Sequence, residues 1–248
     1  LKEGGFYNLG QDLVNHCIND ILVSGAYPLF FLDYFASSAI KSNEVIQFVK
    51  GISFACRKSG CVLLGGETAE MPDVYKDDRT DLVGTIVGRQ TFSGAISGKQ
   101  NICENDIVIG LPSNGLHTNG YSLIRKIKES NIPEEYMKYL TQIHRSYLEE
   151  IKLLQMNSVN INGLCHITGG GLVENVERIL PVGCGLDIDR SSIMVPKIFQ
   201  HIQSIGNVNE TEMNRVFNMG IGMVIISAEP LEEHDMCRCI GNVISTVQ

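Results

Sequence analysis

The hydrophobic and polar positions along the chain alternate between helical and extended patterns. Apolar residues recur at helical spacing from Gln11 to Ser24 and again from Glu44 to Lys58, with apolar runs typical of buried strands between helical segments. The pattern predicts strands at residues 28–36, 61–64, 81–90, 106–112, 165–168, 184–189 and 220–228, and further helices at residues 121–128, 146–155, 173–180, 196–204 and up to residue 217. This alternation predicts a mixed α/β fold of the α+β class.

A polar stretch at residues 97–105 (SGKQNICEN) lies between two of the predicted strands and has no hydrophobic periodicity. Polar residues and glycine between periodic segments are typical of a connecting loop. We therefore expect two lobes, an N-terminal lobe at residues 1–104 and a C-terminal α/β lobe at residues 105–248.

The composition is that of a globular protein with an acidic surface. Of the 248 residues, 44% are hydrophobic and 19% are charged, which excludes a disordered chain because disordered segments are poor in apolar residues. The 28 acidic residues outnumber the 20 basic ones, and the net charge of −8 disfavours binding to a nucleic-acid backbone. The 25 glycines make up a larger share of the 248 residues than the usual share of about 7%. They indicate places where the backbone approaches a ligand closely.

Eight cysteines are present, mostly within apolar runs, where free cysteine behaves as a small buried hydrophobic residue. No C-x-x-C pair occurs, and Cys237 and Cys239 alone are weak evidence for a zinc site. This usage favours reduced thiols in the cytoplasm. No apolar run approaches the ~20 residues that span a bilayer, and no signal peptide is recognisable, so we expect a cytoplasmic protein without membrane contact.

Four polar residues share one face of the first predicted helix. Asp12, His16, Asn19 and Asp20 stand at positions i, i+4, i+7 and i+8, which places them on the same side of a helix. Hard cations such as Mg²⁺ prefer oxygen ligands and are usually held by one or two carboxylates together with substrate phosphates. An ordinary solvated face is the alternative, although such a face carries lysine and arginine more often than asparagine and histidine.

The segment GGETAEM follows directly after a short buried strand, which we expect to end at Gly65 and Gly66. Ligands of open α/β sheets bind beyond the carboxyl ends of the strands, where glycines admit them to the backbone. Glu67 and Glu70 add carboxylate oxygens at this point. The alternative is a simple turn into a helix that Thr68 caps.

Two further loops lead from a strand into a helix. The first, LPSNGLHTNGYSLIRK, offers hydroxyl, amide and backbone N–H groups to an anion, and its His117 could transfer protons near neutral pH. The second, HITGGGLVEN, is a plausible phosphate cradle, although its spacing fits neither the Rossmann nor the P-loop pattern. A structural histidine and an ordinary glycine turn are the alternatives. A weaker signal, RVFNMGIGM, places Asn218 and Gly220 between a helix and a strand. Together the loops favour a magnesium–nucleotide or phosphorylated small molecule as ligand.

Five long segments, in order, resemble the aminoimidazole ribonucleotide synthetase family, also called phosphoribosylformylglycinamidine cyclo-ligases. They are CINDILVSGAYPLFFLDYFA, LLGGETAEMP, GLHTNGYSLIRK, HITGGGLVENVERILP and MNRVFNMGIGM. The resemblance implies ATP-dependent ring closure of formylglycinamidine ribonucleotide to aminoimidazole ribonucleotide in purine biosynthesis, with release of ADP and phosphate. It also implies a need for Mg²⁺, and a homodimer whose N-terminal lobes pair through a barrel-like β interface beside the nucleotide cleft.

The resemblance also implies roles for individual residues. Asn19, Asp20 and Glu67 would hold the magnesium of Mg-ATP, and His117 and His166 would transfer protons on the substrate side. The residues expected to bind ATP or phosphate are Asp33, Gly65, Gly66, Thr68, Ser113, Asn114, Thr168, Gly169, Gly170 and Gly171. The reaction would begin with attack of the formyl oxygen on the γ-phosphate of ATP. The ring nitrogen would then add to the same carbon, and phosphate would leave.

The sequence departs from the family pattern at three places. A DGVGTK-like motif and a glycine-rich segment normally precede the first block, so we expect a preceding segment ahead of Leu1. The family's Pro-Thr-x-Ile-Tyr stretch reads Leu-Thr-Gln-Ile-His at residues 140–144, and the chain stops soon after CRCIGNVI.

Other functions remain open from the sequence. Relatives of the same fold are formylglycinamide ribonucleotide amidotransferase, thiamine-monophosphate kinase, which typically has a GGDT-like motif, and selenophosphate synthetase. An inactive scaffold is the alternative from another class.

Overall fold

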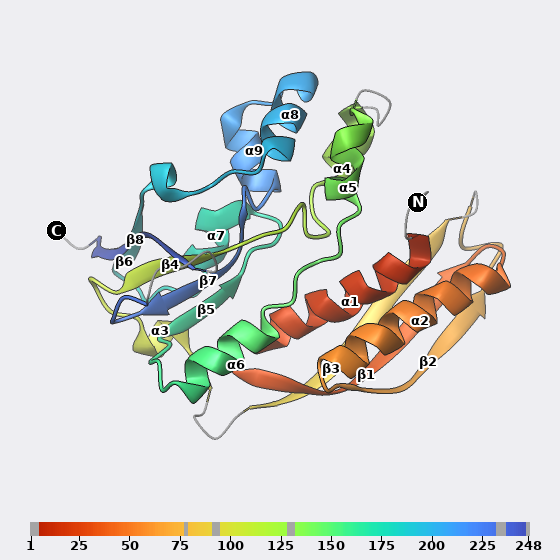
Figure 1. Ribbon diagram of the computed structural model, residues 1–248, viewed down its shortest axis with the longest axis horizontal. Coiled ribbons are helices and arrows are strands. Elements are labelled where there is room, and N and C mark those ends of the chain that lie inside the picture. The colour runs from red at the N-terminus through yellow and green to blue at the C-terminus, as the bar shows by residue number, and fades with distance from the viewer. Residues whose placement is uncertain (1–4, 77–78, 91–94, 128–131, 232–236, 247–248) are drawn as a thin grey trace. The chain divides into compact units, whose positions relative to one another are not determined.

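The computed structural model describes residues 5–76, 79–90, 95–127, 132–231 and 237–246. The chain divides into two compact units, unit 1 at residues 1–94 and unit 2 at residues 95–248 (Figure 1). Residues 95–104, which the predicted boundary assigns to the first lobe, lie in unit 2, where Gly98 packs against Ile179. Both units combine helices with a sheet, which confirms the predicted mixed α/β class.

Unit 1 is a three-stranded sheet with two helices on one face. Its elements are α1 (Gly5–Leu22), β1 (Ala26–Ser37), α2 (Ser42–Lys58), β2 (Val62–Glu70) and β3 (Thr80–Gln90). The strand order is β2-β1-β3, with β2 parallel and β3 antiparallel to β1. The two helices lie side by side across the sheet (Figure 1). Phe35 of β1 packs against Phe48 of α2, with ring centroids 5.5 Å apart.

Glycines set how closely the helices of unit 1 approach their neighbours. A Cβ on Gly51 of α2 would meet the backbone of Tyr7 on α1. A Cβ on Gly84 of β3 would lie 3.0 Å from the Leu13 side chain of α1, and one on Gly88 would lie 2.7 Å from Ile21. Because only glycine leaves this space empty, α1 can pack directly onto α2 and β3.

The other face of the unit 1 sheet carries exposed apolar side chains and is called the open face below. Val62 of β2 is 58% exposed, and Val83 and Val87 of β3 are 45% and 39% exposed. These residues alternate along their strands with side chains directed toward the helices, as the twofold repeat of a strand requires. No helix covers this face among the described residues of unit 1.

Unit 2 contains a five-stranded antiparallel sheet in the order β5-β7-β4-β8-β6. Its strands are β4 (Ile107–Pro112), β5 (Gly163–His166), β6 (Cys184–Ile188), β7 (Ile221–Ser227) and β8 (Arg238–Ser245). Its helices are α3 (Gly98–Asn101), α4 (Tyr121–Ile127), α5 (Glu134–Leu140), α6 (Leu148–Met156), α7 (Gly171–Glu177), α8 (Lys197–Gly206) and α9 (Glu210–Val216), with a 3₁₀ turn at Arg190–Ser192. All seven residues of β7 are buried, so this strand forms the centre of the unit.

Two hydrophobic clusters stabilise unit 2. The first joins the sheet to α7 through residues such as Val176, Val224 and Ile240. The second joins α4, α5, α8 and α9, which gather beyond one end of the sheet (Figure 1), and includes Phe199 and Phe217. The rings of Phe199 and Phe217 lie 5.6 Å apart. Loops between the sheet and these helices are therefore held between two packed cores.

Most predicted elements are confirmed, but one strand extends well beyond its predicted end. β2 does not end at Gly65 and Gly66 but continues to Glu70, paired with β1 along its length. The strand continues because the Asp33 side chain of β1 occupies the space where Gly66 has no Cβ. The hydrophobic pattern also fails to predict α3, α5 and β8. In β8, Gly241 and Asn242 interrupt the apolar run.

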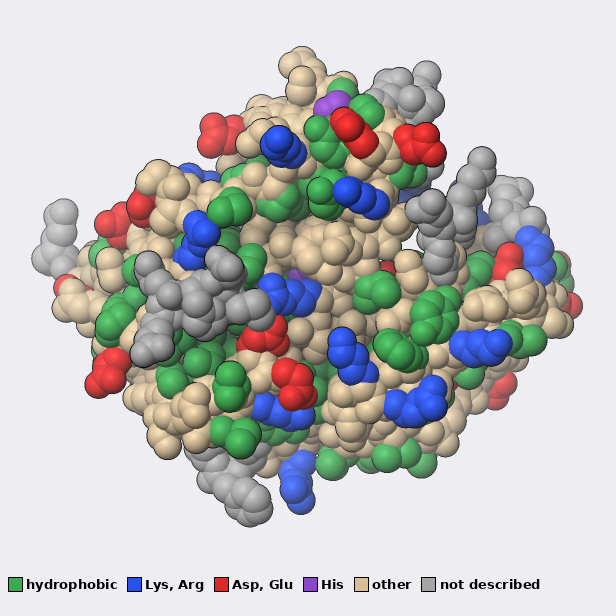
Figure 2. Space-filling model, viewed as in Figure 1, with side chains coloured by type: hydrophobic (Ala, Val, Ile, Leu, Met, Phe, Trp, Pro, Cys, Tyr) green, Lys and Arg blue, Asp and Glu red, His purple; other side chains and the backbone are tan. Residues whose placement is uncertain are grey.

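Charged side chains of both signs are interspersed on the face that Figure 2 shows, without a continuous basic surface among its described residues. None of the described helices combines the length and the hydropathy that crossing a bilayer requires. No disulfide joins any of the eight cysteines, all of which lie within the described residues. Burial raises the pKa of the Cys17 thiol to about 11 and that of Cys165 to about 12, so both remain protonated near neutral pH.

The close contact between α1 and α2 leads to a stability prediction. Gly51→Ala would place a methyl group 2.9 Å from the carbonyl carbon of Tyr7. We expect the free energy of unfolding in urea to fall by about 1–2 kcal/mol, because the overpacking cost exceeds the gain in helix propensity. The matched control is Gly65→Ala in β2, where nothing lies within 4 Å of the added carbon. An equal loss of stability in both variants would contradict the close-packing explanation.

Candidate functional site

The polar face predicted on the first helix is present on α1 of unit 1. His16 Nε2 lies 3.2 Å from Asp20 Oδ2, as positions i and i+4 on one side of a helix allow. Asn19 is completely buried, whereas the Asp20 side chain is 52% exposed. The two predicted ligands on this helix therefore stand in different surroundings, and only Asp20 is readily accessible to water.

Asp33 and Glu67 belong to neighbouring strands but to opposite faces of the sheet. Asp33 lies between Phe31 and Phe35, whose side chains are buried toward the helices, and Asp33 pairs with Gly66. Burial raises the pKa of the Asp33 carboxyl above its usual value. Glu67 is exposed and pairs with Tyr34, the next residue along, so its side chain emerges on the open face.

The three predicted magnesium ligands do not fit one ion within a single chain. Asp20 neighbours Ile21, which packs on Gly88, and Gly88 pairs with Pro28 of β1. Glu67 pairs with Tyr34, six residues further along β1, which is roughly 20 Å in an extended strand. Glu67 also lies on the opposite face of the sheet. Asn19 and Asp20 of α1 thus cannot share an ion with Glu67 of the same chain.

In unit 2, the loop after β4 is held in place by the buried side chain of Asn218. The Ser113 hydroxyl donates to Asn218 Oδ1 at 2.9 Å, and the Gly220 N–H donates to the same oxygen at 2.9 Å. Asn218 Nδ2 donates in turn to the Gly115 carbonyl at 2.9 Å. The weak Asn218 and Gly220 signal in the sequence is therefore the anchor of this loop, and the Ser113 hydroxyl is engaged in it.

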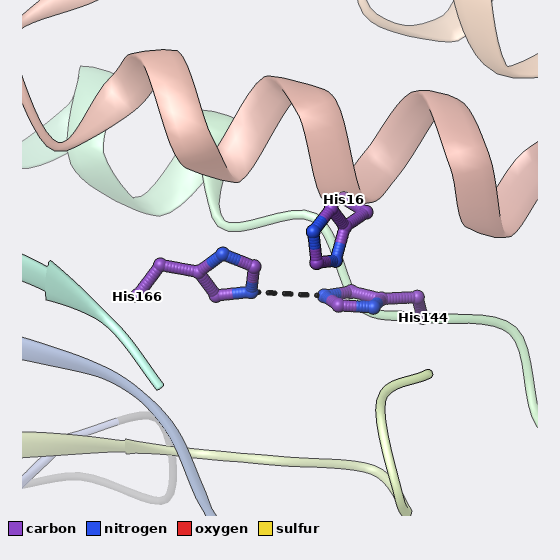
Figure 3. Close-up of side chains that lie close together, drawn as sticks. All are labelled: His16, His144 and His166. Atoms are coloured by element: carbon purple, nitrogen blue, oxygen red, sulfur yellow. Dashed lines mark hydrogen bonds between the residues drawn. The ribbon is translucent and has the colours of Figure 1, made fainter. Parts of the chain in front are cut away.

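Three nearly buried histidines of unit 2 form a connected chain. The rings of His117 and His144 are stacked with centroids 4.4 Å apart. His144 Nε2 lies 3.1 Å from His166 Nε2 (Figure 3), and His144 Nδ1 lies 3.3 Å from the Thr118 hydroxyl oxygen. His117 Nε2 lies 2.6 Å from Asn114 Oδ1. The exposed fractions are 2%, 1% and 6% for His117, His144 and His166, so water has little access to this chain.

The glycine turn after β5 is fixed by Asn175 of α7. Asn175 Nδ2 lies 3.3, 3.2 and 2.7 Å from the carbonyl oxygens of Thr168, Gly169 and Gly171. The Thr168 hydroxyl donates to Asn175 Oδ1 at 3.4 Å. Gly170 and Gly171 have positive φ angles of 104° and 73°, which glycine adopts without steric cost.

The backbone N–H groups of this turn are partly engaged within the protein. The Gly170 N–H donates to the Arg215 carbonyl at 3.0 Å, and the Gly171 N–H donates to the Thr168 carbonyl at 3.2 Å. Around Gly169 the space is open, because only Asn119 Oδ1, at 3.9 Å, would lie near an added Cβ. Of the predicted phosphate cradle, Gly169 is thus the glycine that a ligand can approach most closely.

Gly169 and Gly170 line a cavity of about 340 Å³ that the sequence does not reveal. Its polar and charged lining residues are Asn119, Ser122, Lys126, Glu212 and Arg215. Arg215 holds Glu212 with two hydrogen bonds of 2.8 Å, which lower the pKa of that carboxyl. Lys126 adds a second positive charge, so the cavity lining is net positive in a chain whose net charge is −8. The cavity is chemically suited to an anion.

The structure links His117 to His166 through His144, which the motifs do not indicate. His144 was missed because it lies in a segment without glycine and reaches His166 only through the fold. Asn175 stands at the end of the HITGGGLVEN motif, and its position four residues after Gly171 is the one signal of its contact. The predicted ligand roles of Ser113, Asn114 and Thr168 stay predictions, because all three side chains are engaged within the loops.

Sequence profiles of one family match both parts of the chain. The profile described as "AIR synthase related protein, C-terminal domain" matches residues 104–239, which is more than half of the chain. The profile described as "AIR synthase related protein, N-terminal domain" matches residues 4–90.

Curated relatives and solved structures agree with these matches. A protein of Desulfitobacterium hafniense named phosphoribosylformylglycinamidine cyclo-ligase is 48% identical over 226 residues, and the match covers 88% of this chain and 66% of that protein. A protein of the same name from Pseudothermotoga lettingae is 44% identical over 227 residues, with the same coverage. The chain thus spans slightly less than two thirds of these relatives' length.

Among solved structures, the thiamine monophosphate kinase of Aquifex aeolicus has a similar fold, with a TM-score of 0.74. The sequence identity is 16%, and the match covers 97% of this chain and 78% of that one. At this identity the likeness concerns the fold alone.

The role of Asn175 in holding the glycine turn leads to a prediction. Asn175→Ala should lower the free energy of unfolding by about 1–3 kcal/mol, because the buried carbonyl group of Gly171 loses its donor. Amide hydrogen exchange at Gly170 should also become faster, since the turn opens more readily. Asn157→Ala is the matched control, because Asn157 is exposed at the end of α6. Unchanged exchange at Gly170 in the Asn175 variant would contradict this role.

Proposed function

The chain belongs to the AIR synthase related family, and on this premise we propose that it closes the imidazole ring of formylglycinamidine ribonucleotide at the expense of ATP. The products would be aminoimidazole ribonucleotide, ADP and phosphate, in purine biosynthesis. The observation that carries the proposal is the 48% identity to a cyclo-ligase over 226 residues. The identity to the thiamine monophosphate kinase is only 16%, which favours the cyclo-ligase over the kinase alternative.

The reaction needs a leaving group, because an amide oxygen departs poorly by itself. The formyl oxygen would attack the γ-phosphorus of ATP, forming a C–O–P bond as the bond to ADP breaks. The amidine nitrogen would then add to the formyl carbon, lose its proton, and expel phosphate with the electron pair of the C–O bond. The protein would contribute by positioning the reactants and accepting the proton.

Within unit 2, His166 is our candidate for the group that accepts this proton. It ends β5 directly before the glycine turn, and its ring belongs to the buried histidine chain. His117, the other candidate from the sequence, has its Nε2 atom engaged by Asn114 and its ring stacked on His144. We propose that His117 supports the histidine chain by stacking on His144, and that His166 contacts the substrate.

The net-positive cavity beside Gly169 is our candidate for the substrate's phosphate group. Lys126 and Arg215 line it, and Gly169 leaves its inner wall open. Arg215 already neutralises Glu212, so a doubly negative phosphate would find the charge of Lys126 available. A hydrogen bond to a charged group contributes about 1.5–3 kcal/mol. The cavity can thus hold the substrate while the turn presents it to His166.

ATP would bind to unit 1, by resemblance to the family. The candidate residues Asp33, Gly65, Gly66 and Thr68 lie together on the neighbouring strands β1 and β2, and the three residues on β2 are exposed. No step is assigned to magnesium here, because Asn19 and Asp20 do not share a site with Glu67 in one chain. Asp20 is the accessible carboxylate of the α1 face.

The open face of unit 1 is the candidate homodimer interface. Val62, Val83 and Val87 expose apolar side chains together on one side of a small sheet. Contiguous exposed apolar surface of this kind marks an interaction site, and a second copy of the chain offers the same surface in return. The resemblance also implies a homodimer, in which the N-terminal lobes pair through a barrel-like β interface.

The activity is tested with the full gene product. Phosphate release from ATP should require formylglycinamidine ribonucleotide, because that substrate supplies the attacking oxygen, and aminoimidazole ribonucleotide should appear in equal amount. Thiamine monophosphate, the substrate of the kinase alternative, should not stimulate phosphate release. Phosphate release that is indifferent to formylglycinamidine ribonucleotide would rule out the cyclo-ligase.

The same assay tests the cavity through Lys126→Gln. We expect the KM for formylglycinamidine ribonucleotide to rise about tenfold, which corresponds to 1.4 kcal/mol of lost binding. The KM for ATP should stay unchanged, since ATP is placed on unit 1. Lys138→Gln is the matched control, because Lys138 lies on α5 over the Tyr139 ring and outside the cavity. A selective rise in the KM for ATP would show that the substrate's phosphate does not bind in this cavity.

The dimer is tested by Val83→Glu on the open face. We expect the mass measured by light scattering to fall from that of two chains to that of one, because a carboxylate would be buried in an apolar interface. Ile46→Glu on α2 is the matched control, since Ile46 is 49% exposed but lies on the helical side of unit 1. A Val83→Glu protein that remains dimeric would exclude this face as the interface.

A further inference from the structure

The hydrogen bonds around Thr118 determine which nitrogen of His144 carries a proton. The Thr118 hydroxyl lies 2.6 Å from the carbonyl oxygen of His117 and donates its only hydrogen there. The hydroxyl oxygen can then only accept from His144 Nδ1, which lies 3.3 Å away. A neutral His144 therefore carries its proton on Nδ1 and a lone pair on Nε2.

The same reasoning passes from His144 to His166. The two Nε2 atoms lie 3.1 Å apart, so one of them must donate and the other accept (Figure 3). Because His144 Nε2 carries the lone pair, His166 Nε2 must carry the hydrogen. The neutral His166 ring then has its lone pair, and thus its basicity, on Nδ1.

We propose that His144 is a positioning residue that holds His166 in the Nε2–H tautomer, so that Nδ1 of His166 accepts the proton released in ring closure. This inference rests on the proposed function for the identity of the proton donor. The ordering of the tautomers rests only on the contacts within unit 2. A base with a fixed tautomer presents its lone pair in one direction, as histidines oriented by a second hydrogen-bonding group do elsewhere.

Burial of the two rings enforces this assignment of tautomers. His144 is 1% exposed and His166 is 6% exposed, so water cannot readily replace a missing partner. Leaving a buried donor without an acceptor is costly, so one tautomer is strongly preferred over the other. The stacked ring of His117, inclined by 23° to that of His144, keeps His144 from turning away.

The backbone of the loop is strained at the point that aims the Thr118 hydroxyl. His117 and Thr118 are consecutive residues with φ angles of 54° and 62°, a region that residues other than glycine seldom adopt. Such strain persists only where the surroundings enforce it. Here the Asn114 bond to His117 Nε2 and the Asn119 bond to the His117 carbonyl hold the loop. The strain therefore places Thr118 where His144 needs an acceptor.

The tautomers can be read directly by NMR on the full gene product labelled with ¹⁵N-histidine, without substrate. At about pH 8, where ordinary imidazoles are neutral, we expect an Nδ1–H signal pattern for His144 and an Nε2–H pattern for His166. His144→Gln and His166→Gln assign the two resonances. His201→Gln is the control, because His201 stacks on Tyr136 and lies outside the chain of three histidines.

Thr118→Val tests the cause of the order, because valine keeps the branched shape and removes the acceptor. We expect His144 to lose its preference for Nδ1–H and His166 to become a mixture of tautomers, whereas Thr118→Ser, which keeps the oxygen, should recover both patterns. In the ring-closure assay, Thr118→Val should lower kcat about tenfold or more while the KM for substrate stays within twofold. A merely structural role of Thr118 would leave the tautomers of the folded protein unchanged.

An Nδ1–H pattern for His166 in the unaltered protein would overturn the inference, as would unchanged tautomers in Thr118→Val. The outcome for the proposed function is separate, because the spectra need no substrate. Tautomers as expected in a protein that does not close the ring would overturn the cyclo-ligase activity and leave the order of protons in place.

Discussion

The burial of β7 is the constraint on which unit 2 depends. All seven residues of this strand are buried between β5 and β4, so the strand itself can carry no accessible polar group. Polar chemistry is displaced to the points where the sheet ends. His166 ends β5 opposite Met223, and Asn218 and Gly220 stand directly before β7. Because these groups are fixed by the pairing of a buried strand, the loops they hold are positioned with little freedom.

In unit 1, the packing of the helices depends on glycines. Glycines at the crossing of α1 and α2 and along β3 let the two helices lie flat on one face of a small sheet. The other face keeps its exposed valines, and Glu67 emerges among them. The Glu67 carboxylate on that face and the Asp20 carboxylate on α1 therefore lie in different surroundings. For this reason residues of two neighbouring sequence blocks need not act on one ion.

The predictions from the sequence agree best with the structure for features that a local residue pattern determines. Helical and extended periodicity placed most elements, and the strand-end loops pointed to His117 and His166. The same reasoning failed for Gly66, because β2 stays paired with β1 through this residue, and the Asp33 side chain lies in the space beside it. It also missed His144, whose partner His166 is 22 residues away. No local pattern of residues 140–144 signals that contact.

The sequence by itself determined the class of fold, the order of the elements, the family resemblance and the kinds of side chain available for proton transfer. Only the tertiary structure decided which of these side chains meet, because hydrogen bonds such as those between Ser113 and Asn218 and between His144 and His166 join segments far apart in the chain. Periodicity reports which side of an element is buried. It does not report which side chains the neighbouring element places there. Those side chains decide which histidines contact one another and keep Glu67 apart from Asp20.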